Sequence, residues 1–243
     1  DGAGANHQNL AGIDERGGER KRFIYYDYPG GGGGGRASKD GLDFVRTLRS
    51  GNVNAQSIEI LENLFPITFL RHELRPDSGG PGEFRGGLGV VREYRTASEG
   101  SFSMLGDHAL IPTGGLYHGF PGATVRWEVV RDGEVLPISP RFGSKVASFP
   151  IEAGDVVRVL TQGGGGYGDP LKRDPELVRE DVRDNKVSHK AAYDMYGVAL
   201  DTGTGNVRAA CDLERRRLTT TAVHSSALES RTFATAAWVP PPA

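Results

Sequence analysis

Alternation of apolar and polar residues recurs along this chain and predicts β-strands. It is seen in residues 67–78, ITFLRHELRPDS, and in residues 89–95, GVVREYR, which a glycine-rich segment joins. The stretch KRFIYYDYPG, residues 21–30, mixes aromatic and β-branched side chains before a proline. Runs of this kind bounded by turn residues are typical of strands. The pattern therefore predicts three strands here, two of them linked as a hairpin or a Greek key.

The clearest local signal is the hairpin predicted in residues 124–138, TVRWEVVRDGEVLPI. Asp132-Gly133 separates two apolar runs, and this dipeptide readily adopts the positive φ angles of a type I′ turn. That register would place Arg131 opposite Glu134. Residues 140–162 predict one or two more strands, with a turn from Glu152 to Asp155.

The period changes near the end of the chain, where residues 173–198 predict two short helices. Asp174 is placed to cap the first helix and Pro175 to occupy its first turn. Ser188 can cap the second helix, which would stop at Gly197. Upstream, residues 57–66 have apolar residues near helical spacing, which favours a helix without deciding it.

These elements predict an α+β fold that is mainly β, with antiparallel or mixed strands, glycine-rich loops and a small C-terminal helical unit. Residues 1–20 are polar and glycine-rich and are expected to be a flexible lead. Residues 21–170 form the predicted β-rich region and residues 171–200 the helical unit. Residues 201–243, rich in Ala, Ser and Thr toward their end, are expected to be a divergent, disordered tail.

Composition narrows the classes of function. The 29 basic and 31 acidic residues nearly cancel, so no electrostatic footprint for nucleic acid or an anionic membrane is visible. A lone cysteine and the lack of a long apolar run or a signal segment predict a soluble, cytoplasmic protein. Because the chain opens with Asp1, we expect a processed product or a piece of something longer.

Histidines are the first place to look for chemistry. Asp107 and His108, with His118 ten residues on, are the candidate catalytic residues for proton transfer or metal binding. The alternative is that these are loop histidines hydrogen-bonded to the backbone. No HExxH, HxH or paired cysteines occur, so we predict no metal site in this chain.

The glycine-rich run GGGGYGDP, residues 163–170, follows a predicted strand and precedes a predicted helix. Successive N–H groups in such a loop can bind an anion, which makes the run a candidate substrate or phosphate site. It lacks the lysine and hydroxyl of a P-loop, so a structural corner is the favoured alternative. The candidate residues are Gly163, Gly164, Gly165, Gly166 and Tyr167.

Arg75, Asp77 and Arg85 surround a second group of glycines in residues 75–89. They are further candidates for contacting a substrate or phosphate. The favoured alternative is an Arg–Asp pair that locks the turn, because charged turn residues commonly stabilise their own loop.

Three long motifs in order carry a family resemblance. Residues 25–52, YYDYPGGGGGGRASKDGLDFVRTLRSGN, residues 73–95, ELRPDSGGPGEFRGGLGVVREYR, and residues 152–198 resemble the C-terminal part of the hydantoinase B/oxoprolinase family. The similarity extends from about Phe23 to Val198. The tail beyond about Cys211 does not resemble the family.

The resemblance implies a B-type subunit that works with a hydantoinase A-type subunit to hydrolyse a cyclic amide or imide. ATP and Mg are expected on that partner, which phosphorylates the carbonyl, and none is predicted on this chain. Relatives also include acetone and acetophenone carboxylases, so a ketone carboxylase subunit is an alternative, as is a non-catalytic docking module. Family chains are longer, so the missing N-terminal part and any metal site are expected outside this chain. Either a separate polypeptide carries them, as in a split subunit, or this chain is a fragment.

Overall fold

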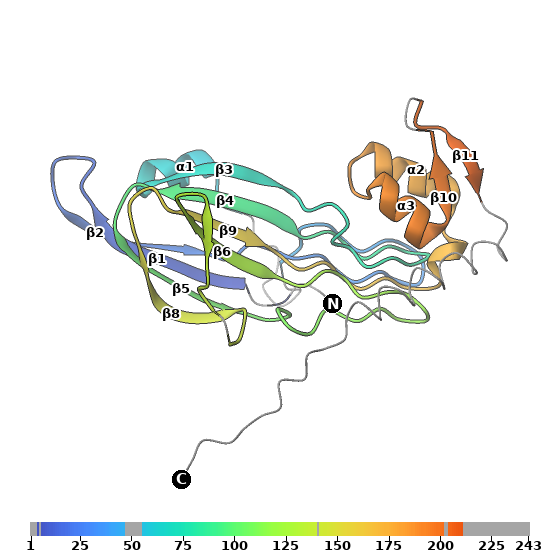
Figure 1. Cartoon of the computed structure of the whole chain (residues 1–243), viewed down its shortest axis with the longest axis horizontal. Coiled ribbons are helices and arrows are strands. Elements are labelled where there is room, and N and C mark those ends of the chain that lie inside the picture. The colour runs from blue at the N-terminus through green and yellow to red at the C-terminus, as the bar shows by residue number, and fades with distance from the viewer. Residues whose placement is uncertain (1–3, 5, 47–54, 140, 202–203, 211–243) are drawn as a thin grey trace, which may run out of the picture.

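Two antiparallel sheets pack face to face in the computed structural model of the chain (Figure 1). Extended glycine-rich segments run from the sheets to a small helical unit at the far end. The predicted class, α+β and mainly β, is confirmed. The structure describes residue 4 and residues 6–46, 55–139, 141–201 and 204–210.

The first sheet has the strand order β2-β1-β5-β8. Its strands are β1 (Asn6–Asp14), β2 (Lys21–Asp27), β5 (Gly100–Gly106) and β8 (Lys145–Ile151). Neighbouring strands are antiparallel throughout.

The prediction of a flexible lead over residues 1–20 is wrong where β1 lies. Alternate residues at the start of this strand are buried, but two of the inward side chains, Asn6 and Gln8, are polar. The Asn6 amide donates to the Pro29 carbonyl at 3.1 Å, and the Gln8 amide donates to the Asp27 carboxylate at 3.0 Å. These hydrogen bonds offset the cost of burying the two amides. Since the buried positions include polar residues, the strand lacks the alternation of apolar and polar residues by which a strand is predicted from sequence.

The second sheet has the order β3-β4-β9-β6-β7. The glycine-rich link predicted between residues 74 and 90 joins two antiparallel neighbours in it. Its strands are β3 (Ile67–Leu74), β4 (Val90–Thr96), β6 (Arg126–Arg131), β7 (Glu134–Leu136) and β9 (Val156–Leu160).

The predicted hairpin is confirmed in detail. Arg131 pairs with Glu134, and the turn residues Asp132 and Gly133 have φ angles of 51° and 84°. The turn at Glu152–Asp155 is also present, but it connects β8 in one sheet to β9 in the other. This turn is thus one of the connections at which the chain crosses between the sheets.

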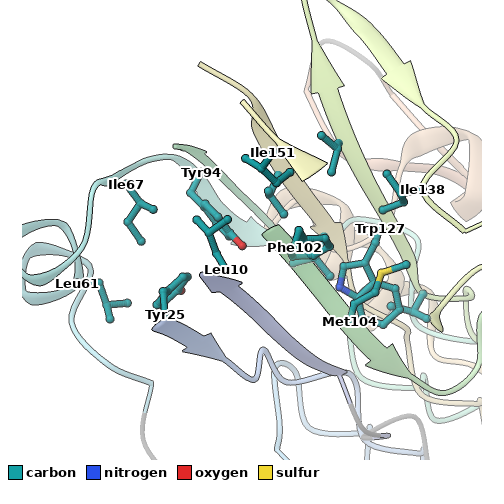
Figure 2. Close-up of a cluster of buried hydrophobic side chains, with 14 residues drawn as sticks. Leu10, Tyr25, Leu61, Ile67, Tyr94, Phe102, Met104, Trp127, Ile138 and Ile151 are labelled. Carbon is teal, nitrogen blue, oxygen red and sulfur yellow. The ribbon is translucent and has the colours of Figure 1, made fainter. Parts of the chain in front are cut away.

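The core lies between the sheets (Figure 2). Leu10, Tyr25 and Phe102 come from the first sheet, and Tyr94 and Trp127 come from the second. The short helix α1 (Ile58–Leu64), favoured by the spacing of residues 57–66, packs Leu61 against this core.

A chain of polar groups also crosses the core. The Trp127 indole donates to Gln8 at 3.2 Å, Gln8 donates to Asp27, and Asp27 pairs with Arg92 at 2.8 Å. Arg92 also stacks 4.5 Å from the centre of the Phe69 ring. Since Asp27 and Arg92 are buried, each charge depends on the other.

We call the four extended segments of residues 30–35, 78–87, 113–123 and 162–168 the glycine bundle. The last segment, residues 162–168, lies against the other three. N–H groups three residues apart along it donate to the same neighbouring segment. Three residues per turn is the period of the polyproline II helix. The hydrogen bonds are Gly163 to Ala123 O (3.1 Å), Gly164 to Gly87 O (3.0 Å), Gly166 to Phe120 O (2.9 Å) and Tyr167 to Phe84 O (2.9 Å).

Neighbouring backbones in the bundle approach closely enough to exclude a side chain. A Cβ on Gly163 would lie 1.7 Å from the Ser78 carbonyl oxygen, and one on Gly164 would lie 1.9 Å from the Gly33 carbonyl oxygen. Residues 163–168 are therefore an extended member of the bundle. The predicted structural role, in which glycine permits close backbone approach, is confirmed, but the run is extended and does not form a corner.

The helical unit follows η2 (Pro170–Lys172) and contains α2 (Pro175–Arg183) and α3 (His189–Tyr196). The predicted caps are confirmed. The Asp174 carboxylate accepts from Glu176 N at 2.9 Å, the Ser188 hydroxyl oxygen accepts from Ala191 N at 3.0 Å, and Gly197 adopts a φ of 64°.

The predicted tail begins too early. Strands β10 (Val198–Leu200) and β11 (Val207–Ala210) pair as a hairpin beside α2 and α3, so part of residues 201–210 belongs to the helical unit. The rest of that prediction, residues 211–243 with Cys211, lies outside the described residues. Across the described ranges, every helix is too short or too polar to cross a membrane.

Candidate functional site

The candidate site that brings predicted side chains together is a cleft near the end of the glycine bundle, beside the start of the helical unit. It has a volume of about 670 Å³ and contains two of the predicted residues, His118 and Tyr167. We call it the aromatic cleft. Its lining residues are Glu83, Tyr117, His118, Phe120, Tyr167, Gly168, Asp169, Pro170, Leu171 and Lys172.

A strained turn holds His118 at this cleft. Tyr117 and His118 have φ angles of 49° and 75°, and Gly119 N donates to Leu116 O at 2.9 Å across them. This region of φ costs energy for residues with a side chain, and such residues cluster at functional sites. The turn is fastened to the bundle, because Leu116 N donates to Gly166 O at 2.9 Å and the Leu116 carbonyl accepts from Gly168 N at 3.0 Å.

The cleft combines aromatic walls with ionisable groups. The rings of Tyr117 and Tyr167 are 5.0 Å apart, and both side chains line the space. Asp169 is fixed because its carboxylate accepts from Leu171 N at 2.9 Å. An imidazole, carboxylates and an ammonium group can together move protons and bind an anionic group, and the rings can bind a flat ring. Among the residues that the structure describes, no group of three or more His, Cys, Asp or Glu side chains is placed to hold a metal ion.

Asp107 and His108 lie elsewhere, at the end of the bundle nearest the sheets. His108 Nδ1 is 3.1 Å from the Ile111 carbonyl oxygen, and the His108 carbonyl accepts from Val125 N at 3.1 Å. This is the backbone contact that the alternative interpretation of the loop histidines expected. Since His118 lines the cleft at the other end of residues 162–168, the three predicted residues do not form one cluster.

Gln162 is a polar residue near His108 that sequence reasoning missed. A Cβ placed on Gly4 would lie 3.0 Å from Gln162 Nε2 and 3.1 Å from His108 Cδ2. The Gln162 side chain is fully buried, and neither of its amide atoms has a hydrogen-bond partner among the described residues. No sequence motif marks it, because its burial follows from the packing of the bundle.

Three of the four glycines in the run 163–166 do not offer their N–H groups to an anion. Gly163, Gly164 and Gly166 donate to backbone carbonyls within the bundle, as does Tyr167. Gly165 O in turn accepts from Gly35 N at 2.8 Å. The nest that a phosphate would need is therefore taken up by backbone pairing, and Tyr167 remains through its side chain in the aromatic cleft.

Arg75 and Asp77 serve the backbone and do not pair with each other. Arg75 Nη1 donates to the carbonyls of Thr124 and Thr161 at 2.8 and 3.0 Å. Asp77 accepts from Ser188 N at 2.8 Å, which ties the turn to the start of α3. The predicted Arg–Asp lock is thus wrong for these residues, because each side chain reaches a different element.

Arg85 belongs to a buried charge network that fastens the helical unit to the bundle. It contacts Asp43 at 3.3 Å and Asp181 of α2 at 3.4 Å. Arg173 joins the same network through Asp181 at 2.8 Å and Asp40 at 2.7 Å. Burial opposes the charge of Arg85, but the surrounding carboxylates outweigh it and raise the pKa of the guanidinium.

The family model described as hydantoinase B/oxoprolinase matches residues 2–170. An uncharacterized protein of Methanocaldococcus jannaschii is 41% identical over 178 residues, which is 73% of this chain and 31% of that protein. A putative B-type D-/L-hydantoinase subunit of a Pseudomonas species is 35% identical over 181 residues, covering 73% of this chain and 30% of the relative.

Two solved structures share the fold. The ATP-dependent caprolactamase from Pseudomonas jessenii superposes with a TM-score of 0.66 at 26% identity, over 89% of this chain and 37% of that one. Nucleotide-free acetone carboxylase gives a TM-score of 0.68 at 22% identity, over 97% of this chain and 34% of that one. The chain thus spans about a third of the length of these two relatives and these two solved structures.

Proposed function

The chain belongs to the hydantoinase B/oxoprolinase family, and from this membership we propose that it is the C-terminal part of a B-type subunit of an ATP-dependent cyclic amidohydrolase. The substrate would be a lactam, a hydantoin or a related imide. The observation that carries the proposal is the family match across residues 2–170, supported by the likeness to a caprolactamase and to a B-type hydantoinase subunit.

The proposal divides the reaction between polypeptides. A hydantoinase A-type subunit would bind ATP and Mg and phosphorylate the carbonyl oxygen of the ring amide. The remaining part of a B-type subunit, whether on the same protein or on a separate polypeptide, would complete the enzyme, because this chain spans about a third of these two relatives. A cytoplasmic location is included in the proposal, since a lone cysteine fits a reducing compartment.

Within this division, the aromatic cleft would receive the activated ring. Tyr117 and Tyr167 would pack against the ring, and Lys172 would face its phosphoryl group. His118 would take a proton from the attacking water and deliver it to the ring nitrogen as the C–N bond breaks. One water adds to the phosphorylated carbon, and breaking the C–N bond leaves an amine and an acyl phosphate. A second water hydrolyses the acyl phosphate, so the products are the ring-opened amino acid, ADP and inorganic phosphate.

The test mixes this chain with an A-type subunit and the rest of a B-type subunit and measures ADP formation that depends on a lactam or hydantoin. Turnover is expected only with all components present. Full activity without this chain would overturn the proposal. If ADP formation instead required bicarbonate and a ketone, the chain would belong to a carboxylase, and an intact complex that turns over equally well with His118→Gly would favour a docking role.

A further inference from the structure

A second concavity borders the aromatic cleft and has an apolar character. It has a volume of about 440 Å³, and we call it the glycine groove. Backbone of the glycine bundle forms much of its lining, with side chains of Leu42, Val45 and Leu116 and the polar Arg36 around it. The bundle residues that line it are 33–35, Gly114, Leu116 and 165–166.

The leucines of the groove are left uncovered by the described part of this chain. Leu42 is 54% exposed and Leu116 is 60% exposed. The glycines between them carry no side chains that could fill the space. Apolar surface gathered in a concavity marks a place where another apolar group binds.

The outer face of the five-stranded sheet provides a contrast. Arg71, Glu93, Arg158 and Glu128 form a row of alternating charge across β3, β4, β9 and β6. Cross-strand pairs of opposite charge stabilise one another, and here they provide partners for Glu93, which is buried beneath its neighbours. The groove has no comparable row, since Arg36 is the one charged side chain among the described residues that line it.

We propose that the glycine groove receives aliphatic side chains from the part of a B-type subunit that lies outside the span of this chain. This inference rests on the proposed function. About two-thirds of the length of two of the relatives and of the caprolactamase has no counterpart here, so in proteins of this family a long further stretch is present to cover apolar surface of this region. A groove with glycine backbone as its floor admits protruding side chains from such a segment.

The position of the groove gives the contact a consequence for the cleft. Leu116 in the groove precedes Tyr117 in the cleft, and Gly166 in the groove precedes Tyr167 in the cleft. A segment seated on Leu116 therefore borders the strained turn that carries His118. The aromatic cleft, open in this chain alone, gains a further wall when the groove is filled.

The test compares the isolated chain with a chimera in which the aligned part of this chain replaces the corresponding part of the Methanocaldococcus jannaschii relative, an alignment of 178 residues. Leu116→Cys is introduced in both, and its reaction rate with a maleimide is followed by peptide mass spectrometry, which separates it from Cys211. We expect at least tenfold slower labelling in the chimera. Leu105→Cys, on β5 and 54% exposed like Leu42, is the matched control and should label at equal rates in both.

Several outcomes would overturn the inference. Equal labelling of Leu116→Cys in the two proteins would show an empty groove, and equal protection of both cysteines would show general burial. Protection in the isolated chain that grows with its concentration would assign the groove to a second copy, and protection that needs an A-type subunit would assign it to that partner. Labelling needs neither ATP nor substrate, so a protected groove in a chimera without lactam-dependent ADP formation would sink the proposed function alone.

Discussion

Gly163 leaves no room for even a methyl group, because a Cβ there would meet the Ser78 carbonyl oxygen at 1.7 Å. Gly114 lies in the same bundle, yet a Cβ on it would have nothing within 4 Å. Both glycines lie in glycine-rich segments of the sequence, and they differ in whether another backbone lies against them. Comparing substitutions at the two positions therefore measures how much the stability of the bundle depends on the close approach of neighbouring backbones.

Gly163→Ala is expected to lower the free energy of unfolding by about 3 kcal/mol, since neighbouring backbone must move to admit the methyl group. Gly114→Ala is the control and should change it by less than about 1 kcal/mol. Urea unfolding followed by circular dichroism measures both. Equal stability of the two variants would contradict the close approach of residues 78 and 163.

His118→Gly separates the imidazole from the turn that carries it. Glycine tolerates the φ of 75° at this position, so stability should be kept or slightly raised. If His118 moves protons in the proposed reaction, lactam-dependent turnover by the assembled enzyme should fall by about 100-fold or more.

The control for this prediction is His189→Gln, at an exposed position on α3. It should leave turnover unchanged. Retention of full turnover by His118→Gly would remove His118 from the mechanism.

Among the elements, the helical unit is joined to the bundle through charge. Arg173 is nearly fully buried and pairs with Asp40 and with Asp181 of α2. Asp40 lies in the stretch of sequence between the first two bundle segments. A buried charge left without its partner is costly, so this junction depends on every member.

Arg173→Gln is expected to destabilise the helical unit by about 3 kcal/mol, because Asp40 and Asp181 lose their cation. Amide hydrogen exchange should rise in α2 and α3 and stay unchanged in β4 and β9. Arg179→Gln, which removes an exposed pair with Glu176, is the control and should cost less than about 1 kcal/mol. Uniform acceleration across the sheets would contradict a local junction.

The same junction predicts a dependence on pH. Burial alone would raise the pKa of Asp40, but hydrogen bonds and charge from Arg173 outweigh it and hold that pKa below its ordinary value of 3.8. The stabilising effect of Asp40 is therefore present above about pH 4 and is lost as the pH falls through the lowered pKa. The stability difference between the wild type and Asp40→Asn, from urea unfolding, should shrink as the pH falls below about 4. A difference that grows there would contradict the assignment.

On the scale of the whole molecule, one continuous stretch of chain links three kinds of packing. It leaves the sandwich in β9, passes through the bundle as residues 162–168 and enters the helical unit at η2. The aromatic cleft lies near the end of that path and is built from segments that are far apart in sequence. Residues 162–168 connect the sandwich to the cleft, so the position of the cleft residues depends on the folded sandwich.

Asp27→Asn tests the polar chain that crosses the sandwich core. With its carboxylate gone, Arg92 would remain charged in a buried position, so the free energy of unfolding should fall by about 3 kcal/mol. Asp14→Asn, at a more exposed pair with Arg16, should cost less than about 1 kcal/mol. Thermal unfolding measures both, and similar losses would show that Arg92 does not depend on Asp27.

Local signals in the sequence were sufficient for much of the fold. The Asp132-Gly133 hairpin, the Asp174 and Ser188 caps and the stop at Gly197 were predicted because neighbouring residues alone decide those conformations. Strand β1 was missed, since its inward side chains include amides whose partners lie on β2 and in the segment that follows it. The sequence alone does not show that a polar residue is buried, because its burial depends on a hydrogen-bond partner that only the fold brings near.

Sequence alone was enough for the family, the mainly β class and the turns and caps, because each depends on motifs or on contacts between near neighbours. What the glycines do follows only from the tertiary packing. Their N–H groups pair across segments separated by up to about 130 residues, as between Gly32 and Gln162, and the absence of side chains lets those backbones meet. The same packing brought His118 to Tyr167 and left Asp107 and His108 elsewhere, since spacing along a chain does not measure distance across a bundle.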